Sequence, residues 1–250
     1  SNGDLNGVKK ITKITNTVNS NNYNLIATTN TNVILLSGTN DSSINIIQND
    51  QNPLNIIRSD SSITHPSNNL NFLSISNHLI NQSNELFVLD DQLKSLFKFD
   101  ISGMLTLDKA ILNNDTPGRL MTGMVGSPGT ITDRNKFYHP VSMVSVDDLI
   151  HVLDFHPQQG SSIKTFDSQL NWKNNTSLGV ALSSGPIDIE YNQDTRRFYI
   201  LCHITAYGGS PTAPELVVYD EMFNFIESID LMDSDKHNES IKSETFKSLY

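Results

Sequence analysis

The sequence predicts an all-β fold that is built from a repeated unit of four short strands. Its central stretch is YHPVSMVSVDDLIHVLDFHPQQGSSIKTFD, residues 138–167. Polar turns separate three apolar runs in this stretch, which are Val141–Val146, Leu149–Leu153 and Ile163–Phe166. Runs of about five β-prone residues bounded by turn residues are typical of strands. The pattern recurs upstream in ELFVLDDQLKSLFKFD and downstream in RFYILCHI and ELVVYD. One supersecondary unit is therefore repeated along the chain.

The composition agrees with a single all-β domain. A chain of 250 residues can bury a sizeable core. Its hydrophobic content is 37% and its charged content only 18%. Asn and Ser make up the difference, and Asn is dense in the first part of the chain. Asn is common in β-turns. We attribute its abundance to the codon composition of an AT-rich genome. A prion-like segment is disfavoured, because aliphatic residues interrupt the Asn runs at strand-like spacing.

The charge and the apolar pattern exclude several classes of function. A net charge of −10 argues against a general nucleic-acid binder and against binding to an anionic membrane surface. No apolar run approaches the length of a membrane span, and the N-terminus lacks the apolar region of a signal peptide. The single cysteine, Cys202, lies in an apolar run, so we expect a buried hydrophobe and no internal disulfide. We predict no nucleic-acid partner and no membrane insertion. The sequence does not indicate the compartment, and a virion or extracellular location is compatible with it.

Four strands in each unit, recurring roughly every 45 to 65 residues, predict a β-propeller with four to five visible blades. We place the propeller at residues 1–232 and a polar tail, or the start of a further blade, at 233–250. The four predicted blades are approximately 20–58, 70–112, 137–182 and 185–232. In the first blade the runs are Leu25–Ala27, Val33–Leu36, Ile44–Ile47 and Leu54–Ile57. The alternating stretch Leu5–Val18 reads as a further half-buried strand. These features and the absence of an initial Met suggest a segment of a longer chain, or an unusually small propeller.

The repeated unit has a recognisable order of residues. In the third unit a proline precedes the first strand, an acidic turn follows it, the second strand ends in Asp and the third in Phe-Asp. The residues are Pro140, Asp147-Asp148, Asp154 and Phe166-Asp167. Unit two matches at Leu86–Asp90 and Phe99-Asp100, and unit four at Pro186 and Tyr219-Asp220, whereas unit one has Ile47-Gln48 in place of the aromatic residue and the acid.

This pattern resembles the NHL-type (YVTN-like) repeat family of β-propellers. The resemblance covers units two to four, which is over half of the chain. It implies a propeller that commonly closes with about six blades. It implies little about function, because the family includes substrate platforms of ligases, lyases and structural proteins.

The antiparallel order of the strands places the irregular segments on one face. Loops between the second and third strands emerge at the same end as the connections from one blade to the next. Segments 113–136, 155–160 and 204–214 all belong to these two classes. Loops on a rigid scaffold often carry binding residues, so we predict that this loop-rich face binds protein partners. The candidate binding residues are Arg119, Asp133, Arg134, His139, Asp154, His156, His203 and Tyr207.

The sequence contains no strong catalytic signal. The histidines lack the close spacing of a metal site, and neither a G-x-S-x-G elbow nor a phosphate-binding loop is present. Asp133 and Asp154 could form the acid/base pair of a hydrolase. Yet Asp recurs at 90, 100, 167 and 220, where a carboxylate serves turn hydrogen bonds. We therefore predict no catalytic residue, no metal and no cofactor.

We predict a non-enzymatic β-propeller that acts as an interaction or structural module of a larger assembly. The composition favours a virion or tail component. One alternative is a propeller enzyme, such as a polysaccharide lyase or glycosidase. Another is a surface glycan-binding protein, in which Trp172 or Tyr207 would stack on a sugar ring.

Overall fold

The computed structural model consists of strands, turns and connecting segments. It describes residues 7–14, 22–39, 44–50, 72, 74–101, 106–111, 136–157, 159–178, 185–205 and 211–231. These residues form sixteen strands and no helix. Accordingly, no helix long and apolar enough to cross a membrane occurs in the described part of the chain.

The strands form four antiparallel sheets of four strands, each in chain order. The first sheet contains β1 (Lys10–Ile14), β2 (Asn22–Thr28), β3 (Val33–Thr39) and β4 (Ile44–Asp50). The second contains β5 (Ile75–Ile80), β6 (Glu85–Asp90), β7 (Ser95–Asp100) and β8 (Thr106–Ile111). The third contains β9 (Pro140–Val146), β10 (Leu149–His156), β11 (Gly160–Asp167) and β12 (Trp172–Ser177). The fourth contains β13 (Pro186–Asn192), β14 (Arg197–Thr205), β15 (Pro211–Asp220) and β16 (Phe225–Asp230).

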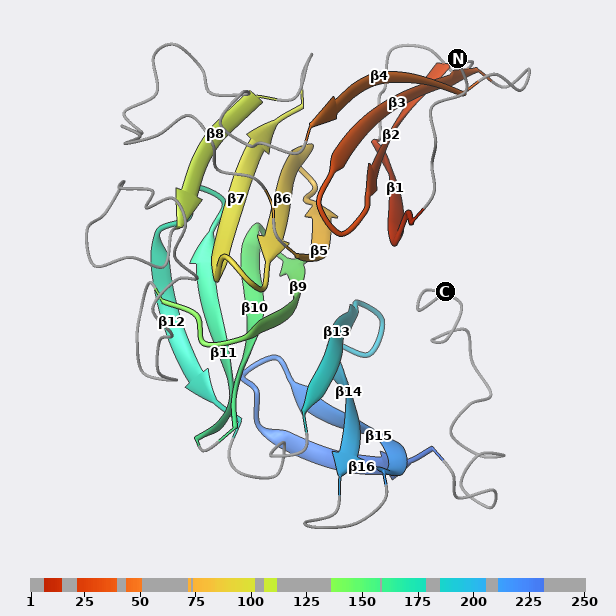
Figure 1. The fold of residues 1–250 in the computed structure, drawn as a ribbon. Helices are drawn as coiled ribbons and strands as arrows, with labels where there is room; N and C mark the ends of the chain where they lie inside the picture. Colours follow the sequence, from red (N-terminus) through yellow and green to blue (C-terminus); the bar gives the residue numbers. More distant parts are fainter. Residues whose placement is uncertain are drawn as a thin grey trace.

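The four sheets are the blades of a β-propeller. They follow one another along an arc, with the first and the fourth blade at its two ends (Figure 1). The first strand of each blade lies innermost, because β1 packs beside β5, β5 beside β9, and β9 beside β13. The predicted all-β propeller is therefore confirmed, with four blades.

Apolar clusters between the faces of neighbouring blades hold the propeller together. The first cluster joins blades one and two, and includes Ile26, Leu35, Phe97 and Phe99. The second joins blades two and three. The third joins blades three and four, where Leu153 and Ile163 meet Ile200 and Cys202. Cys202 is only 1% exposed, as expected, and its burial raises the pKa of the thiol to about 12. Because strands of the inner blades are buried on both faces, their sequences are nearly continuous apolar runs.

The first blade differs from the prediction at its inner edge. The sequence pattern predicted that this blade begins near residue 20 and that Leu5–Val18 is a separate strand. In the structure, Lys10–Ile14 forms β1, the inner strand of the same sheet, and β4 is its outermost strand. The expected run Leu54–Ile57 and the tail 233–250 lie outside the described residues.

The acids that end the third strands of blades three and four form the same turn. Oδ1 of Asp167 accepts the backbone N–H groups of Gln169 and Asn171. Oδ1 of Asp220 likewise accepts those of Met222 and Asn224. In each turn the side-chain amide of the asparagine also donates to the Oδ2 of the aspartate. The turn-forming role expected for Asp167 and Asp220 is confirmed.

A second set of acids fixes the segments that lead into the inner strands. Asp154, at 0% exposure, accepts the backbone N–H groups of Tyr138 and His139 at 2.9 to 3.1 Å. Asp90 plays the same part in blade two, where it accepts the N–H of Ser74. The Nζ of Lys164 lies 3.0 Å from Asp154 Oδ2, and neither side chain is exposed. Asp154 therefore anchors the entry to β9.

Replacement of Lys164 by Met is expected to destabilise the protein by roughly 3–5 kcal/mol, because it leaves a buried carboxylate without its cation. Lys173→Met is the matched control. Lys173 also pairs with an aspartate, Asp167, but its side chain is 49% exposed. The control is expected to cost at most about 1 kcal/mol. Urea unfolding measures both, and equal losses in the two variants would contradict the anchoring role.

His78 connects the first two blades through a buried hydrogen-bonded contact. Its ring lies on β5, 2.8 Å from the hydroxyl groups of Thr12 on β1 and Thr28 on β2. Burial, with a smaller contribution from the nearby Lys10, lowers the pKa of His78 to about 3. The folded chain thus keeps this imidazole neutral at pH values where the unfolded chain protonates it.

This buried imidazole predicts a loss of stability in acid. As pH falls from 6.5 towards 3, His78 becomes protonated in the unfolded chain but stays neutral in the folded chain. This difference costs roughly 1.4 kcal/mol per pH unit. His78→Gln is expected to remove this part of the pH slope, measured by urea unfolding from pH 7 to pH 4. His139→Gln is the comparison: burial also lowers the pKa of His139, but its side chain is 44% exposed, so this variant is expected to change the pH slope less than His78→Gln does. If the free energy of unfolding of His78→Gln kept the same dependence on pH as the parent protein, the prediction would be wrong.

Candidate functional site

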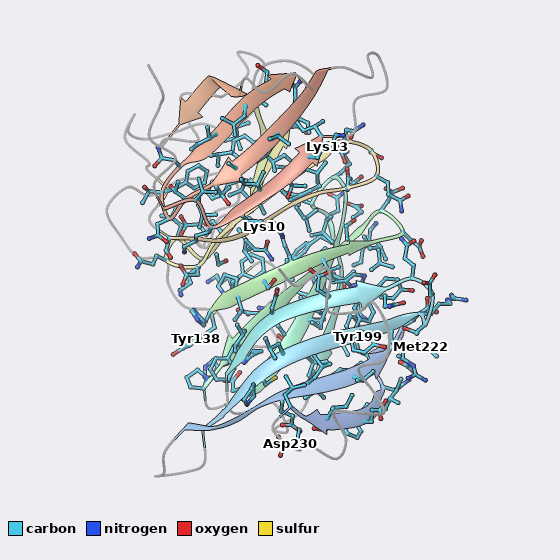
Figure 2. All side chains as sticks on the ribbon, turned by 90° about the vertical axis from the view of Figure 1, so that its right-hand side faces the viewer. Lys10, Lys13, Tyr138, Tyr199, Met222 and Asp230 are labelled. Carbon is cyan, nitrogen blue, oxygen red and sulfur yellow. The ribbon has the colours of Figure 1, made fainter. Side chains whose placement is uncertain are left out.

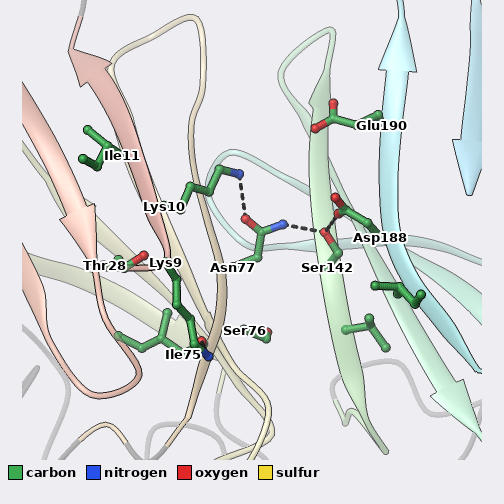
Figure 3. A pocket seen from close by; sticks show the side chains of 12 residues that line it. Lys9, Lys10, Ile11, Thr28, Ile75, Ser76, Asn77, Ser142, Asp188 and Glu190 are labelled. Carbon is green, nitrogen blue, oxygen red and sulfur yellow. Dashed lines mark hydrogen bonds between the residues drawn. The ribbon is translucent and has the colours of Figure 1, made fainter. Parts of the chain in front are cut away.

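The inner strands surround a cavity of about 630 Å³ on the propeller axis (Figure 3). Each blade contributes to its wall through the inner strand or a residue next to it. The polar side chains that matter for its chemistry are Lys9, Lys10, Asn77, Ser142, Asp188 and Glu190.

A series of hydrogen bonds crosses the cavity wall from the first blade to the last. The Nζ of Lys10 donates to Asn77 Oδ1 at 2.8 Å. The Nδ2 of Asn77 donates to Ser142 Oγ at 2.5 Å. The hydroxyl of Ser142 in turn donates to Asp188 Oδ1 at 2.5 Å. The dashed lines in Figure 3 follow this series. It begins at a cation and ends at an anion, and every bond points in the same direction.

The four members of the series occupy equivalent places in their blades. Each lies on the inner strand and pairs with a residue of the second strand: Lys10 with Thr28, Asn77 with Leu89, Ser142 with Leu153, and Asp188 with Leu201. Because side chains alternate across a strand, the first three face the following blade. This shared orientation explains how each side chain reaches the next. The propeller repeat itself therefore builds the series.

The two ends of the cavity wall carry opposite charges. Lys9 and Lys10 come from the first blade, whereas Asp188 and Glu190 come from β13. Solvent reaches Lys10, but the cavity walls surround it, and this burial lowers the pKa of its amine against the opposing effect of Glu190 and Asp188. Burial raises the pKa of Glu190, the neighbouring Asp188 raises it further, and Lys10 opposes both. A polar ligand with a positive and a negative group would match this wall.

Three of the predicted binding residues lie at the loop-rich end of the propeller and are described. Asp154 is the buried anchor, so its carboxylate does not face a ligand. His156 is 8% exposed, and its ring packs against that of Tyr138, with the ring centroids 4.1 Å apart and the planes tilted by 45°. His139 is more open, with its Nδ1 3.9 Å from Asp91 Oδ2. Burial and the nearby Lys94 lower the pKa of His139, although Asp91 opposes them.

The other predicted residues cannot be placed in this surface. Arg119, Asp133, Arg134 and Tyr207 lie outside the described residues. His203 belongs to β14, where it pairs with Pro214. In the described part of the chain, no group of three or more His, Cys, Asp or Glu side chains is arranged to hold a metal ion.

None of the polar residues that line the axial cavity was predicted from the sequence. Lys10, Asn77, Ser142, Asp188 and Glu190 are ordinary polar residues on strands, and no motif marks them. A weak signal was present in the repeat. Ser142 and Asp188 each lie two residues after the proline that opens an inner strand. Alignment of the units on that proline places a polar residue at the same position in both.

No known family model and no curated protein sequence matches the chain. Its fold is similar to several solved structures. Virginiamycin B lyase from Staphylococcus aureus has a TM-score of 0.50 at 12% identity over 92% of this chain. A putative 6-phosphogluconolactonase from Bacteroides uniformis has a TM-score of 0.51 at 10% identity over 89%. The catalytic domain of an α-L-arabinofuranosidase from Coprinopsis cinerea has 0.50 at 10% identity over 92%.

At these low sequence identities, the similarities establish the fold but not a function. The chain spans 58% of the lyase, 56% of the lactonase and 69% of the arabinofuranosidase domain. It therefore corresponds to just over half of the first two structures. The protein belongs, by its architecture, to the class of β-propellers.

The raised pKa of Glu190 predicts a stability change that depends on pH. The folded chain holds the Glu190 proton more tightly than the unfolded chain, so ionisation costs stability as pH rises above 4.5. Glu190→Gln is expected to raise the melting temperature at pH 7, and the gain should vanish below pH 4. Glu227→Gln, at a 51% exposed side chain, is the control. A gain in Glu190→Gln that persists in acid would contradict the assignment.

Proposed function

We propose that the protein is a non-enzymatic interaction module of a larger assembly, and that its loop-rich rim contacts protein partners. The rim is the end of the propeller where the turns between second and third strands meet the connections from one blade to the next. By the antiparallel order of the strands, β4, β8 and β14 end at this rim, and β5, β9 and β15 begin there. This convergence is the observation that carries the proposal.

The described part of the rim has features suited to a protein contact. Tyr138 and His139 lie side by side in the segment that Asp154 anchors. The ring of Tyr138 packs at a tilt against that of His156 in the same blade. Asp91, in a turn of blade two, lies beside His139 of the connection into blade three. A rigid aromatic and imidazole surface of this kind loses little conformational entropy on binding. The narrower assignment to a virion or tail component rests on the composition.

The rim proposal predicts protection of the connection 113–136 in the native assembly. This segment contains the trypsin sites Arg119 and Arg134. We expect cleavage there to be slow in native extract and fast in the purified chain, followed by mass spectrometry. Light scattering on the native material should give a mass above 27.8 kDa. A monomer in native extract that is cut as fast as the purified chain would overturn the proposal.

A pair of rim variants sharpens the test. Tyr138→Ala is expected to reduce incorporation into the native complex by about tenfold or more, as for loss of a central aromatic anchor. Asp194→Ala is the matched control, because Asp194 is an exposed residue in the turn between β13 and β14, at the opposite end of the propeller. Equal incorporation of both variants would count against the rim as the contact surface.

A second candidate function is a propeller enzyme, a polysaccharide lyase or glycosidase, that uses the axial cavity. Asp188 and Glu190 both line this cavity, and their proximity helps to raise the pKa of Glu190. A carboxyl group with a raised pKa beside an ionised one is the arrangement of many acid/base pairs. The discriminating measurement is a polysaccharide-cleavage screen with the protein and its Glu190→Gln variant. Turnover that the variant loses would favour the enzyme over the interaction module.

A further inference from the structure

Four charged side chains line the axial cavity, and none of them forms an ion pair within the described part of the chain. Two are cations of the first blade and two are anions of the last, namely Lys9, Lys10, Asp188 and Glu190. In the body of a blade such charges pair directly, as Lys98 does with Glu85, where the charged atoms lie 2.6 Å apart. The cavity therefore presents opposite charges that remain able to bind the groups of a ligand.

Asn77 and Ser142 keep the two kinds of charge apart. They occupy the places between Lys10 and Asp188 in the hydrogen-bonded series, so the amine and the carboxylate do not meet. Each end of the series uses only part of its capacity. The amine of Lys10 has three N–H groups and donates one of them to Asn77. Oδ1 of Asp188 accepts Ser142 and the N–H of Ile189, whereas its Oδ2 accepts no hydrogen bond from the described residues. Donors at one end and an acceptor at the other are thus available to a ligand.

Glu190 strengthens the acidic end of the cavity. It lies two residues after Asp188 on β13, so the two side chains share one face of the strand. Figure 3 shows both carboxylates directed towards the cavity. Burial raises the pKa of Glu190, and the proximity of Asp188 raises it further. An ammonium group bound beside these two carboxylates would offset their mutual repulsion.

The length of the series limits the size of a ligand that reaches both ends. Its three hydrogen bonds are 2.8, 2.5 and 2.5 Å long, and the amide group of Asn77 joins the first two. The amine of Lys10 and the carboxylate of Asp188 are therefore at most about 10 Å apart. With a hydrogen bond of about 2.8 Å at each end, the charges of the ligand itself lie within about 5 Å of each other. An α-amino acid meets this limit, whereas the terminal charges of an extended dipeptide, at about 3.5 Å per residue, exceed it.

The rest of the cavity wall suits an apolar group. It includes Ile11, Ile75, Val141 and Ile187. Ile11 and Ile187 are 55% and 38% exposed, so contact with an apolar ligand would remove apolar surface from water. The volume of about 630 Å³ lies within the usual range for small-molecule sites. The wall therefore favours an amino acid with an apolar side chain.

We propose that the axial cavity binds a free amino acid with an apolar side chain. Its carboxylate contacts the amines of Lys10 and Lys9, and its ammonium group contacts Asp188 and Glu190. The site needs only residues of the described blades. Figure 2 shows Lys10 on the side of the first blade that is turned towards the later blades, and Tyr138 of the loop-rich rim apart from it at the left edge. This inference goes beyond the rim contact, because amino-acid binding and protection of segment 113–136 can each fail without the other.

Titration calorimetry on the purified chain tests the site, with leucine as the probe. We expect leucine to bind, and glycine to bind at least about tenfold more weakly because it lacks the apolar side chain. N-acetyl-leucine lacks the ammonium charge, leucinamide lacks the carboxylate, and dileucine holds its charges too far apart. Each of these three compounds is therefore expected to bind at least about tenfold more weakly than leucine.

Variants of the chain identify which end of the cavity holds which group. Lys10→Met is expected to weaken leucine binding at least about tenfold but to leave leucinamide binding unchanged, because leucinamide has no carboxylate for Lys10 to contact. Asp188→Asn should likewise weaken the binding of leucine but not that of N-acetyl-leucine. Lys173→Met on β12 and Asp194→Asn in the turn before β14 each remove one charge outside the cavity, and both are expected to bind leucine as the parent chain does.

Circular dichroism shows whether each variant is folded. A parent chain that does not bind leucine, or that binds leucine and N-acetyl-leucine equally, would overturn the inference. So would leucine binding that folded Lys10→Met and Asp188→Asn both retain. If these two variants were unfolded, the preference of the parent chain among the ligands would decide.

Discussion

Apolar packing between the faces of neighbouring blades is the constraint on which the rest of this structure depends. A single four-stranded sheet with apolar residues on both sides cannot bury them alone, so each blade requires neighbours. The clusters that join successive blades supply them, and they bring the four inner strands together at the axis. The cavity, its hydrogen-bonded series and the loop-rich rim all follow from that arrangement.

The fold could be predicted from the sequence because its signal is local and repeated. Short β-prone runs, acidic turns and strand-ending aspartates recur, and the roles of Asp167 and Asp220 in turns follow from hydrogen bonding within a few residues. The inner strand of the first blade was missed because β1 is separated from β2 by residues 15–21 and carries two lysines with only two isoleucines. Its assignment depends on pairing with β2, which no pattern within the strand reveals.

The candidate sites were less predictable, since they depend on contacts between distant parts of the chain. Asp154 was predicted to be a binding residue of the loop-rich face, yet a lysine ten residues away and two backbone groups engage its carboxylate. The axial residues Lys10 and Asp188 are 178 positions apart, and only the stacking of blades connects them. Turns and strands are local in the sequence and can be predicted from it, whereas a site on the propeller axis forms only when all four blades pack together.

The buried Cys202 gives the molecule an internal reporter. Its thiol lies in the cluster between blades three and four, and it is shielded from solvent and held in its neutral form. A thiol reagent can therefore react with it only when the last blade separates from its neighbour or the chain unfolds. The labelling rate in the native protein measures how often that separation occurs. The rate at which Cys202 reacts therefore reports how often the last blade opens away from its neighbour.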